Sequence, residues 1–267
     1  MRNPILVGWI IFQPLFWAFF STSAFSLSRF SISATDQKPR VVVQLSQPGP
    51  SKSGSIELYF KLLDTKTETP LSDSDLRAIH TYKLSLFVFD AGLNEYRFVF
   101  PDFTDGQWHA VLDLPVNGKY FVWAQAVLNN DGFSFLSDSS IQVIEGQVAN
   151  PVPTQLGDHR TGNEGISVVI LESGAVSQGR PTSLQLQFSR IDGSRPVLTP
   201  NRGALADVVG TLVDGGQIFH IHPVDSGLPN QLTLRAVFPV RGDYRLWVQF
   251  IDRGQSRTVP LSVQVQN

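Results

Sequence analysis

The chain has 267 residues, enough for one large domain or two of ordinary size, and 42% of them are hydrophobic, which is enough to build a core. Its formal net charge of -2 argues against nucleic acid and against an anionic membrane surface as electrostatic partners. Cysteine is absent, which excludes disulfides, thiolate metal sites, a cysteine nucleophile and lipid attachment at an N-terminal cysteine.

The first residues have the pattern of an export signal. Arg2 supplies a positive end, residues 5–20 form an apolar run broken only by Gln13 and Pro14, and a stretch of small residues follows at 21–24. We expect a signal peptide at 1–24.

Cleavage after Ala24 is the first choice and cleavage after Ala34 the second, with residues 25–39 as a Ser-rich flexible leader. An uncleaved membrane anchor is the alternative, although the apolar run is shorter than the roughly 20 residues of a full span. We expect the mature protein to be periplasmic or secreted.

After the leader, short strand-like runs recur with Gly, Asn, Asp and Pro between them. In the first half the runs are 41–45, 56–63, 82–90, 96–100, 108–114, 120–128 and 133–144. In the second half they are 166–171, 183–191, 205–213, 218–222, 232–238, 244–251 and 257–265. Residues 72–79 alone suggest a helical turn, with Ser72 as its N-cap.

The two halves share a motif, which indicates an internal duplication. Residues 115–125 and 239–249 both fit P-V-x-G-x-Y-x-x-W-x-Q, at an offset of 124. We therefore predict an all-β chain of two tandem seven-stranded antiparallel sandwiches, Ig-like or cupredoxin-like, with repeat 1 at 40–146, a linker at 147–165 and repeat 2 at 166–267. Tyr120 and Tyr244 take the corner position at which a tyrosine of an Ig-like sandwich bonds back to the preceding loop.

Strand alternation assigns side chains to faces. If Phe219 and Ile221 point into the core of repeat 2, then His220 and His222 point out together. The same rule places Asp207 outward on the neighbouring strand, on a face that we expect to be the outer one.

Two imidazoles about 7 Å apart along a strand, joined by a carboxylate, suit Cu(II), Zn(II) or Ni(II). We predict a metal site of His220, His222 and Asp207, with Cu(II) ahead of Zn(II). Two exposed histidines that hold no metal are the alternative interpretation.

Repeat 2 resembles the YtkA-like type of bacterial periplasmic β-sandwich and, more loosely, cupredoxin-type domains. The residues that carry the resemblance are 203–209, Phe219-His220-Ile221-His222-Pro223 and 238–249. The resemblance implies copper or other heavy-metal handling. In that family a histidine stands where this chain has Asp207, and a further histidine stands near Arg257, so the chain departs from the pattern at two ligand positions and Arg257 is expected to repel a cation.

Repeat 1 has lost the ligand types. Ser85, Phe98 and Phe100 stand where repeat 2 has Asp207, His220 and His222. Phe98, Phe100 and Trp123 are expected on one outward apolar face, which is unusual on a free surface and predicts a cover, either repeat 2 with the linker or a partner protein. The alternative is a face assignment wrong by one residue, as a β-bulge would cause, which would place Phe98 and Phe100 in the core of repeat 1.

The sequence contains no G-x-S-x-G elbow, Gly-rich phosphate loop or H-E-x-x-H helix. We therefore predict a non-enzymatic exported protein that binds a divalent metal, most readily copper, through repeat 2. The competing hypothesis is a structural or protein-interaction module of the periplasm or cell surface with a decayed metal site.

Overall fold

The computed structural model describes residues 39–47, 49–79, 81–150, 165–171 and 174–267. The expected signal peptide, nearly all of the expected leader, and most of the expected linker lie outside this part of the chain. Within it the regular structure is β, apart from one 3-10 turn, η1 at Asp73–Asp75. No helix in the described segments is long and apolar enough to cross a membrane.

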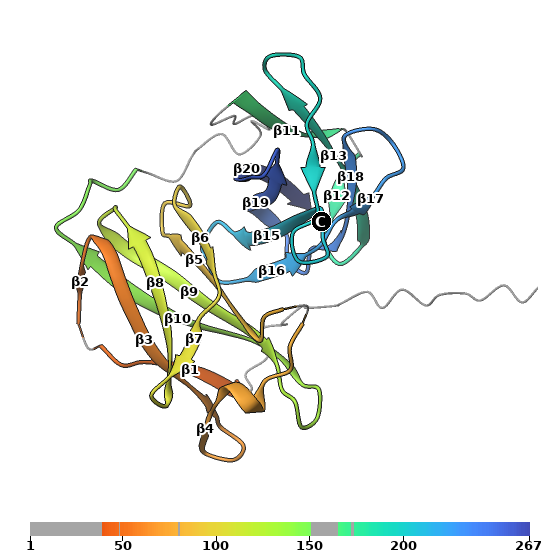
Figure 1. The fold of residues 1–267 in the computed structure, drawn as a ribbon. Helices are drawn as coiled ribbons and strands as arrows, with labels where there is room; N and C mark the ends of the chain where they lie inside the picture. Colours follow the sequence, from red (N-terminus) through yellow and green to blue (C-terminus); the bar gives the residue numbers. More distant parts are fainter. Residues whose placement is uncertain (1–38, 48, 80, 151–164, 172–173) are drawn as a thin grey trace, which may run out of the picture.

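The first half forms a sandwich of two sheets, to the lower left in Figure 1. One sheet has the order β1-β3-β8-β7, with β4 paired to β3, and the other has the order β2-β10-β9-β5-β6. The strands are β1 (Val41–Leu45), β2 (Ser51–Lys52), β3 (Gly54–Asp64), β4 (Thr69–Leu71), β5 (Leu84–Asp90), β6 (Tyr96–Val99), β7 (Asp102–Thr104), β8 (Gln107–Leu114), β9 (Gly118–Val127) and β10 (Ser134–Ile144).

The second half repeats the arrangement, to the upper right in Figure 1. One sheet has the order β11-β13-β18-β17, and the other has the order β12-β20-β19-β15-β16, with β14 paired to β19. The strands are β11 (Ile166–Leu171), β12 (Val176–Ser177), β13 (Pro181–Arg190), β14 (Leu198–Thr199), β15 (Ala206–Leu212), β16 (Ile218–Ile221), β17 (Val224–Asp225), β18 (Gln231–Val237), β19 (Gly242–Asp252) and β20 (Gln255–Gln266).

The chain is therefore all-β, with two tandem Ig-like sandwiches, as predicted. Among the described residues each sandwich has seven strands of four residues or more, and each of these contains or overlaps one predicted run. Three further strands of two or three residues lie at the margins of each sandwich. The long strands pair antiparallel, whereas the two-residue strands β2 and β12 pair parallel with β10 and β20.

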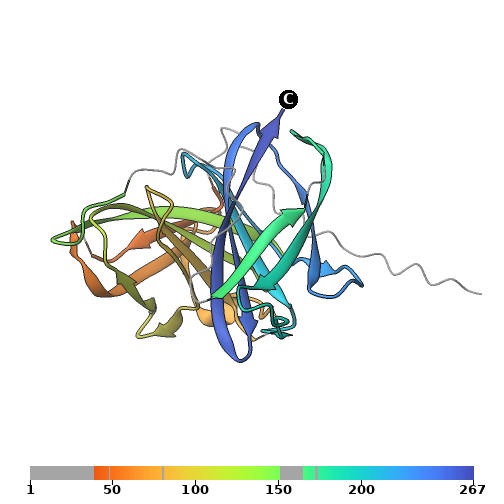
Figure 2. The ribbon, with the colours of Figure 1, turned by 90° about the horizontal axis from the view of Figure 1, so that it is seen from above.

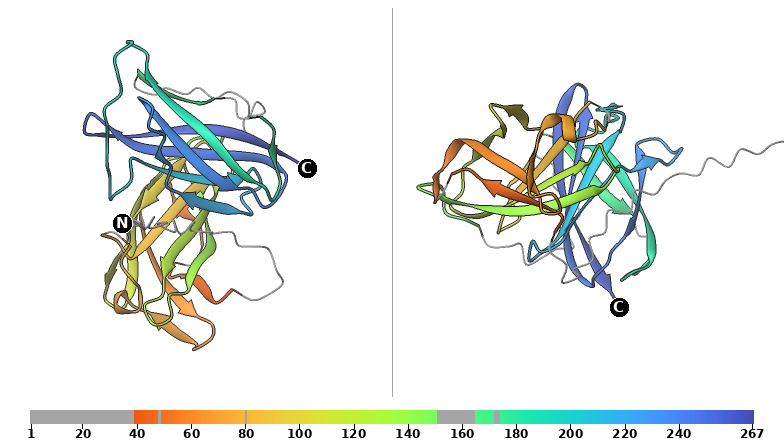
Figure 3. Two further views of the ribbon diagram at one scale, coloured as in Figure 1. Left: turned by 90° about the vertical axis from the view of Figure 1, so that its right-hand side faces the viewer. Right: turned by 90° about the horizontal axis from the view of Figure 1, so that it is seen from below.

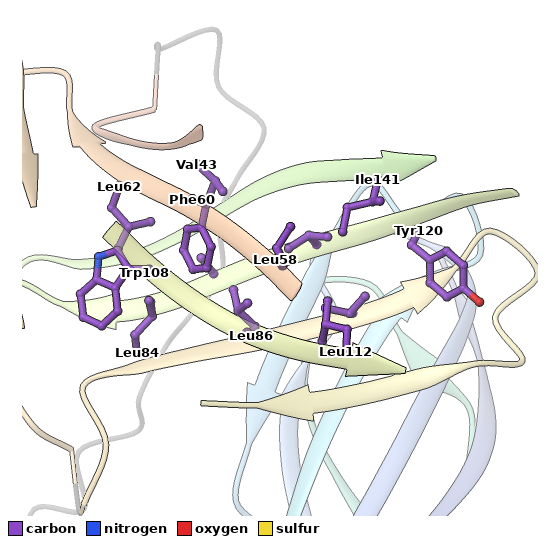
Figure 4. Close-up of a cluster of buried hydrophobic side chains, with 14 of the residues drawn as sticks. Val43, Leu58, Phe60, Leu62, Leu84, Leu86, Trp108, Leu112, Tyr120 and Ile141 are labelled. Atoms are coloured by element: carbon purple, nitrogen blue, oxygen red, sulfur yellow. The ribbon is translucent and has the colours of Figure 1, made fainter. Parts of the chain in front are cut away.

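Alternating side chains build a separate core inside each sandwich. In the first, Phe60, Leu86, Trp108 and Tyr120 are among the buried side chains that fill the space between the sheets (Figure 4). In the second, alternate residues of β19 are buried in the core: Tyr244, Leu246, Val248 and Phe250.

Both predicted tyrosine corners are present. The Tyr120 hydroxyl accepts a hydrogen bond from the backbone N–H of Val116 at 3.2 Å. The Tyr244 hydroxyl donates to the backbone carbonyl of Val240 at 2.9 Å. Each bond fixes the loop that leads into the sixth long strand.

The two sandwiches lie against each other (Figures 2 and 3), and a third cluster of apolar side chains lies between them. We call it the interface cluster; its buried members are Phe87, Phe89, Leu93, Trp123 and Leu136 of the first sandwich and Val209, Ile218 and Trp247 of the second. Trp247 stacks on Tyr96 with ring centroids 4.7 Å apart. The strands of the first sandwich in this contact, β5, β6 and β9, are the repeat equivalents of β15, β16 and β19 in the second. Each sandwich therefore buries the equivalent face of its sheet against the other.

Candidate metal centre

The three predicted ligands come together at the end of the β15–β16 hairpin. The register pairs Val208 with Ile221, so the next residues outward, Asp207 and His222, also lie opposite each other. His220 is two residues before His222 and therefore points to the same side of the sheet. Phe219 and Ile221 alternate with them and pack on the core of the second sandwich, which holds the strand in this orientation.

The spacing of the candidate ligand atoms would allow one metal ion to contact all three side chains. The Nε2 atoms of His220 and His222 lie 3.2 Å and 2.9 Å from Oδ1 of Asp207. One ligand atom from each residue can be chosen so that all lie within 4.8 Å of one another. Atoms bonded to one ion at about 2.0–2.2 Å lie about 3–4 Å apart, so both Nε2–Oδ1 distances fit an ion held between the three side chains.

The site is buried on one side and open on the other. The side chains of Asp207 and His220 are 10% and 12% exposed, whereas that of His222 is 38% exposed. Burial by itself would raise the pKa of Asp207, but hydrogen bonds from both imidazoles and their charges hold that pKa well below its usual range. Burial lowers the pKa of His220 despite its hydrogen bond to Asp207, which favours the neutral imidazole, the form that binds a metal.

The first sandwich forms one wall of the site. The His220 ring contacts Phe87 and Phe98 edge-on, with ring centroids 5.0 Å and 5.5 Å apart. Its Nδ1 lies 2.9 Å from Oε1 of Gln125. His222 is the most exposed of the three candidate ligands. The expectation of an open outer face is therefore wrong: the alternation gave the correct side of the sheet, but repeat 1 covers that side.

Arg257 does not share the face of the ligands. In the register it pairs with Phe250, which points into the core, whereas Asp207 pairs with Gln249 and Gln249 with Thr258. Directly paired residues on neighbouring strands point to the same side of a sheet. Arg257 therefore lies on the opposite side from Asp207, and the repulsion expected from the resemblance has no direct geometric basis.

The repeat-1 residues Phe98, Phe100 and Trp123 face the second sandwich. Trp123 is buried, and Phe98 packs against the interface cluster. The guanidinium of Arg202 lies over the ring of Phe100, 3.7 Å from its centroid. An outside partner at this face stays a prediction, and it requires the two sandwiches to separate.

Sequence reasoning missed Gln125. It is the last residue of the repeat-1 motif, and its twin Gln249 is the cross-strand partner of Asp207. The shared motif contained the information needed to find it. Its tryptophan and its glutamine point away from the core in both repeats. Once the two repeats pack through that side of the sheet, Gln125 must lie at the contact between them.

Comparison with known proteins gives one family match, to a domain of unknown function, DUF8832, over residues 161–267. No curated protein matches the chain. Similar solved structures include fibronectin(III)-like modules of Clostridium thermocellum CbhA, at 15% identity and a TM-score of 0.21, covering 84% of this chain and 94% of that one. A chimeric titin Z1Z2 has 16% identity and a TM-score of 0.21, covering 86% and 100%. A Salmonella alpha-2-macroglobulin mutant has 12% identity and a TM-score of 0.26, covering 89% and 15%.

Proposed function

We propose that this chain is an exported, non-enzymatic protein that binds one divalent transition-metal ion, most readily copper, through Asp207, His220 and His222. The observation that carries the proposal is the convergence of both Nε2 atoms on one carboxylate oxygen of Asp207. The export signal expected at 1–24 and the resemblance of repeat 2 to periplasmic metal-handling sandwiches support the location.

The ligand chemistry favours Cu(II), followed by Zn(II). Imidazole suits copper, zinc and nickel, whereas Cu(I) prefers thiolate and thioether sulfur. The sequence has no cysteine and its single methionine is Met1, so the ligand set contains nitrogen and oxygen alone. An ion held by these three side chains would have room for a water ligand on the exposed side of His222.

The geometry supports reversible binding. Aromatic rings of the first sandwich close the site around His220, and solvent reaches it past His222. An ion can therefore enter and leave on the His222 side without separation of the two sandwiches. This is the behaviour expected of a carrier or a buffer of metal ions.

The test is calorimetric titration of chelator-stripped, untagged protein with Cu(II) and with Zn(II). We expect one ion per chain, and we expect the double variant His220→Ala with His222→Ala to abolish binding. His222→Ala alone is the decisive single variant, because His222 is the most exposed ligand and its loss leaves the interface packed. His109→Ala is the matched control, since His109 stacks on Tyr59 in another sheet and should leave binding unchanged.

Unchanged one-to-one binding in both histidine variants overturns the proposal. An absence of binding in the unmodified protein also overturns it, and favours the alternative of a structural or protein-interaction module with a decayed site. Near-ultraviolet circular dichroism confirms in each case that the aromatic packing of the variant is intact.

A further inference from the structure

One polar contact joins the metal centre to the other sandwich. Nδ1 of His220, in the second sandwich, lies 2.9 Å from Oε1 of Gln125, in β9 of the first. Gln125 is two residues after Trp123, so both side chains point to the same side of their sheet, toward the second sandwich. The rings of Phe87 and Phe98, also from the first sandwich, flank the same imidazole.

The contact bears on how His220 would bind a metal. A neutral imidazole has one N–H, and the nitrogen that binds a metal is the one without it. Nε2 faces Asp207 and His222, so it is the nitrogen that must be bare for all three ligands to share one ion. The proton must then be on Nδ1, where a carbonyl-type oxygen such as Oε1 of Gln125 accepts it.

We propose that Gln125 is a positioning residue of the metal centre: when an ion is bound, it accepts the Nδ1 proton of His220 and so aims the bare Nε2 at the ion. The role rests on the proposed metal-binding function. Partners of this kind, which bond the far nitrogen of a ligating histidine, fix its tautomer and ring orientation. Here the partner belongs to the other repeat, so the complete site exists only while the two sandwiches are packed together.

The packing and the ion therefore stabilise each other. If the packed form binds the ion more tightly than the separated form, then the ion must favour the packed form by the same factor. Gln125 is the residue through which this linkage acts, because its bond to His220 is lost on separation.

The first experiment reads the His220 ring in the Zn(II)-loaded protein, because without an ion the Asp207 carboxylate also attracts the ring proton to Nε2. Long-range nitrogen–proton spectra report which nitrogen carries the proton, and we expect it on Nδ1. That proton should exchange slowly with solvent in the unmodified protein and in Gln125→Glu, which keeps an acceptor oxygen, and faster in Gln125→Leu, which removes the acceptor at similar volume. Zn(II) bound through Nδ1, or an exchange rate in Gln125→Leu equal to that of the unmodified protein, overturns the inference.

The second experiment is Zn(II) titration of the same proteins. Gln125→Leu should weaken binding by about 10–100-fold, the usual effect of losing such a partner, whereas Gln125→Glu should stay close to the unmodified protein. Gln142→Leu, an exposed glutamine in the next strand, is the matched control and should leave the affinity unchanged. If Gln125 only supported the packing of the two sandwiches, then Gln125→Glu should bind Zn(II) as weakly as Gln125→Leu does.

The two proposals fail in different ways. If the unmodified protein binds no Zn(II) and no Cu(II), the proposed function falls, whatever the tautomer. If it binds and Gln125→Leu binds equally well, the role of Gln125 is overturned and the proposed function stands.

Discussion

At the scale of single residues, the corner tyrosines are the most directly testable feature. Burial raises the pKa of Tyr244, and the hydroxyl donates to the Val240 carbonyl, so the folded state favours the protonated form. A group whose folded pKa is raised contributes stability below its unfolded pKa, here about 10, and that stability is lost as the pH rises through the folded pKa.

We therefore expect the free energy of unfolding to fall above about pH 10, where an unfolded tyrosine loses its proton. Tyr244→Phe should lower the free energy of unfolding by roughly 0.5–1.5 kcal/mol at neutral pH. It should also make the fall of this free energy above about pH 10 smaller, because phenylalanine cannot titrate. Tyr120→Phe should cost more, about 1–3 kcal/mol, since it leaves the buried N–H of Val116 unpaired. Urea unfolding at pH 7 and pH 10.5 measures both effects; an equal alkaline loss in all three proteins contradicts the account.

At the scale of elements, the β15–β16 hairpin depends on a glycine. Gly210 pairs with both Phe219 and Leu246, and a Cβ on it would lie 2.2 Å from Cζ of Phe219. The equivalent position of repeat 1 is Val88, which pairs with Arg97 instead. The small residue therefore makes room for the Phe219 ring, which anchors the strand that carries His220.

Gly210→Ala should lower the free energy of unfolding by about 1–3 kcal/mol, the usual cost of overpacking a core, and should also weaken metal binding, because Phe219 and its neighbour His220 move together. The double variant Gly210→Ala with Phe219→Leu should recover part of the stability. Thermal unfolding and Zn(II) titration measure the two effects, and a stable Gly210→Ala variant with full affinity would contradict this reading.

The strands and their faces were predictable from sequence, whereas the small strands and the cover of the site were not. Period-two alternation placed Phe219 and Ile221 inward and His220 outward, because each residue of a strand points away from its neighbours. Strands of two residues, such as β12 and β14, are too short to show a period. Alternation also cannot say what lies opposite a face, so the burial of His220 and the role of Gln125 needed the packed structure.

At the scale of the whole molecule, the interface cluster joins two cores that are each complete. Trp247 is 2% exposed, and its ring contacts Phe89 and Tyr96 of the other sandwich. We expect the two sandwiches to unfold in one calorimetric transition because they share this cluster.

Trp247→Ala should lower the free energy of unfolding by about 3–5 kcal/mol, the usual cost of deleting a buried tryptophan. Most of this loss should come from the contacts between the two sandwiches. The transition should then separate into two, one for each sandwich. Differential scanning calorimetry measures this, with Gln142→Leu as the unperturbed control. A single transition in Trp247→Ala at nearly the original temperature would show that the cluster does not couple the sandwiches.

The burial of the same face in both copies has a consequence for concentrated solutions. When the two sandwiches of one chain separate, each exposes the face that it had buried against the other. A second chain in the same state exposes the same two faces, so a sandwich of one chain can pack against a sandwich of the other. Within one chain the effective concentration of the matching face is on the order of millimolar, so exchange of second sandwiches between chains competes only when the protein itself approaches that range. In such an exchanged dimer each metal centre would draw His220 from one chain and Gln125 from the other, so that both ions would bind at a junction between two polypeptides.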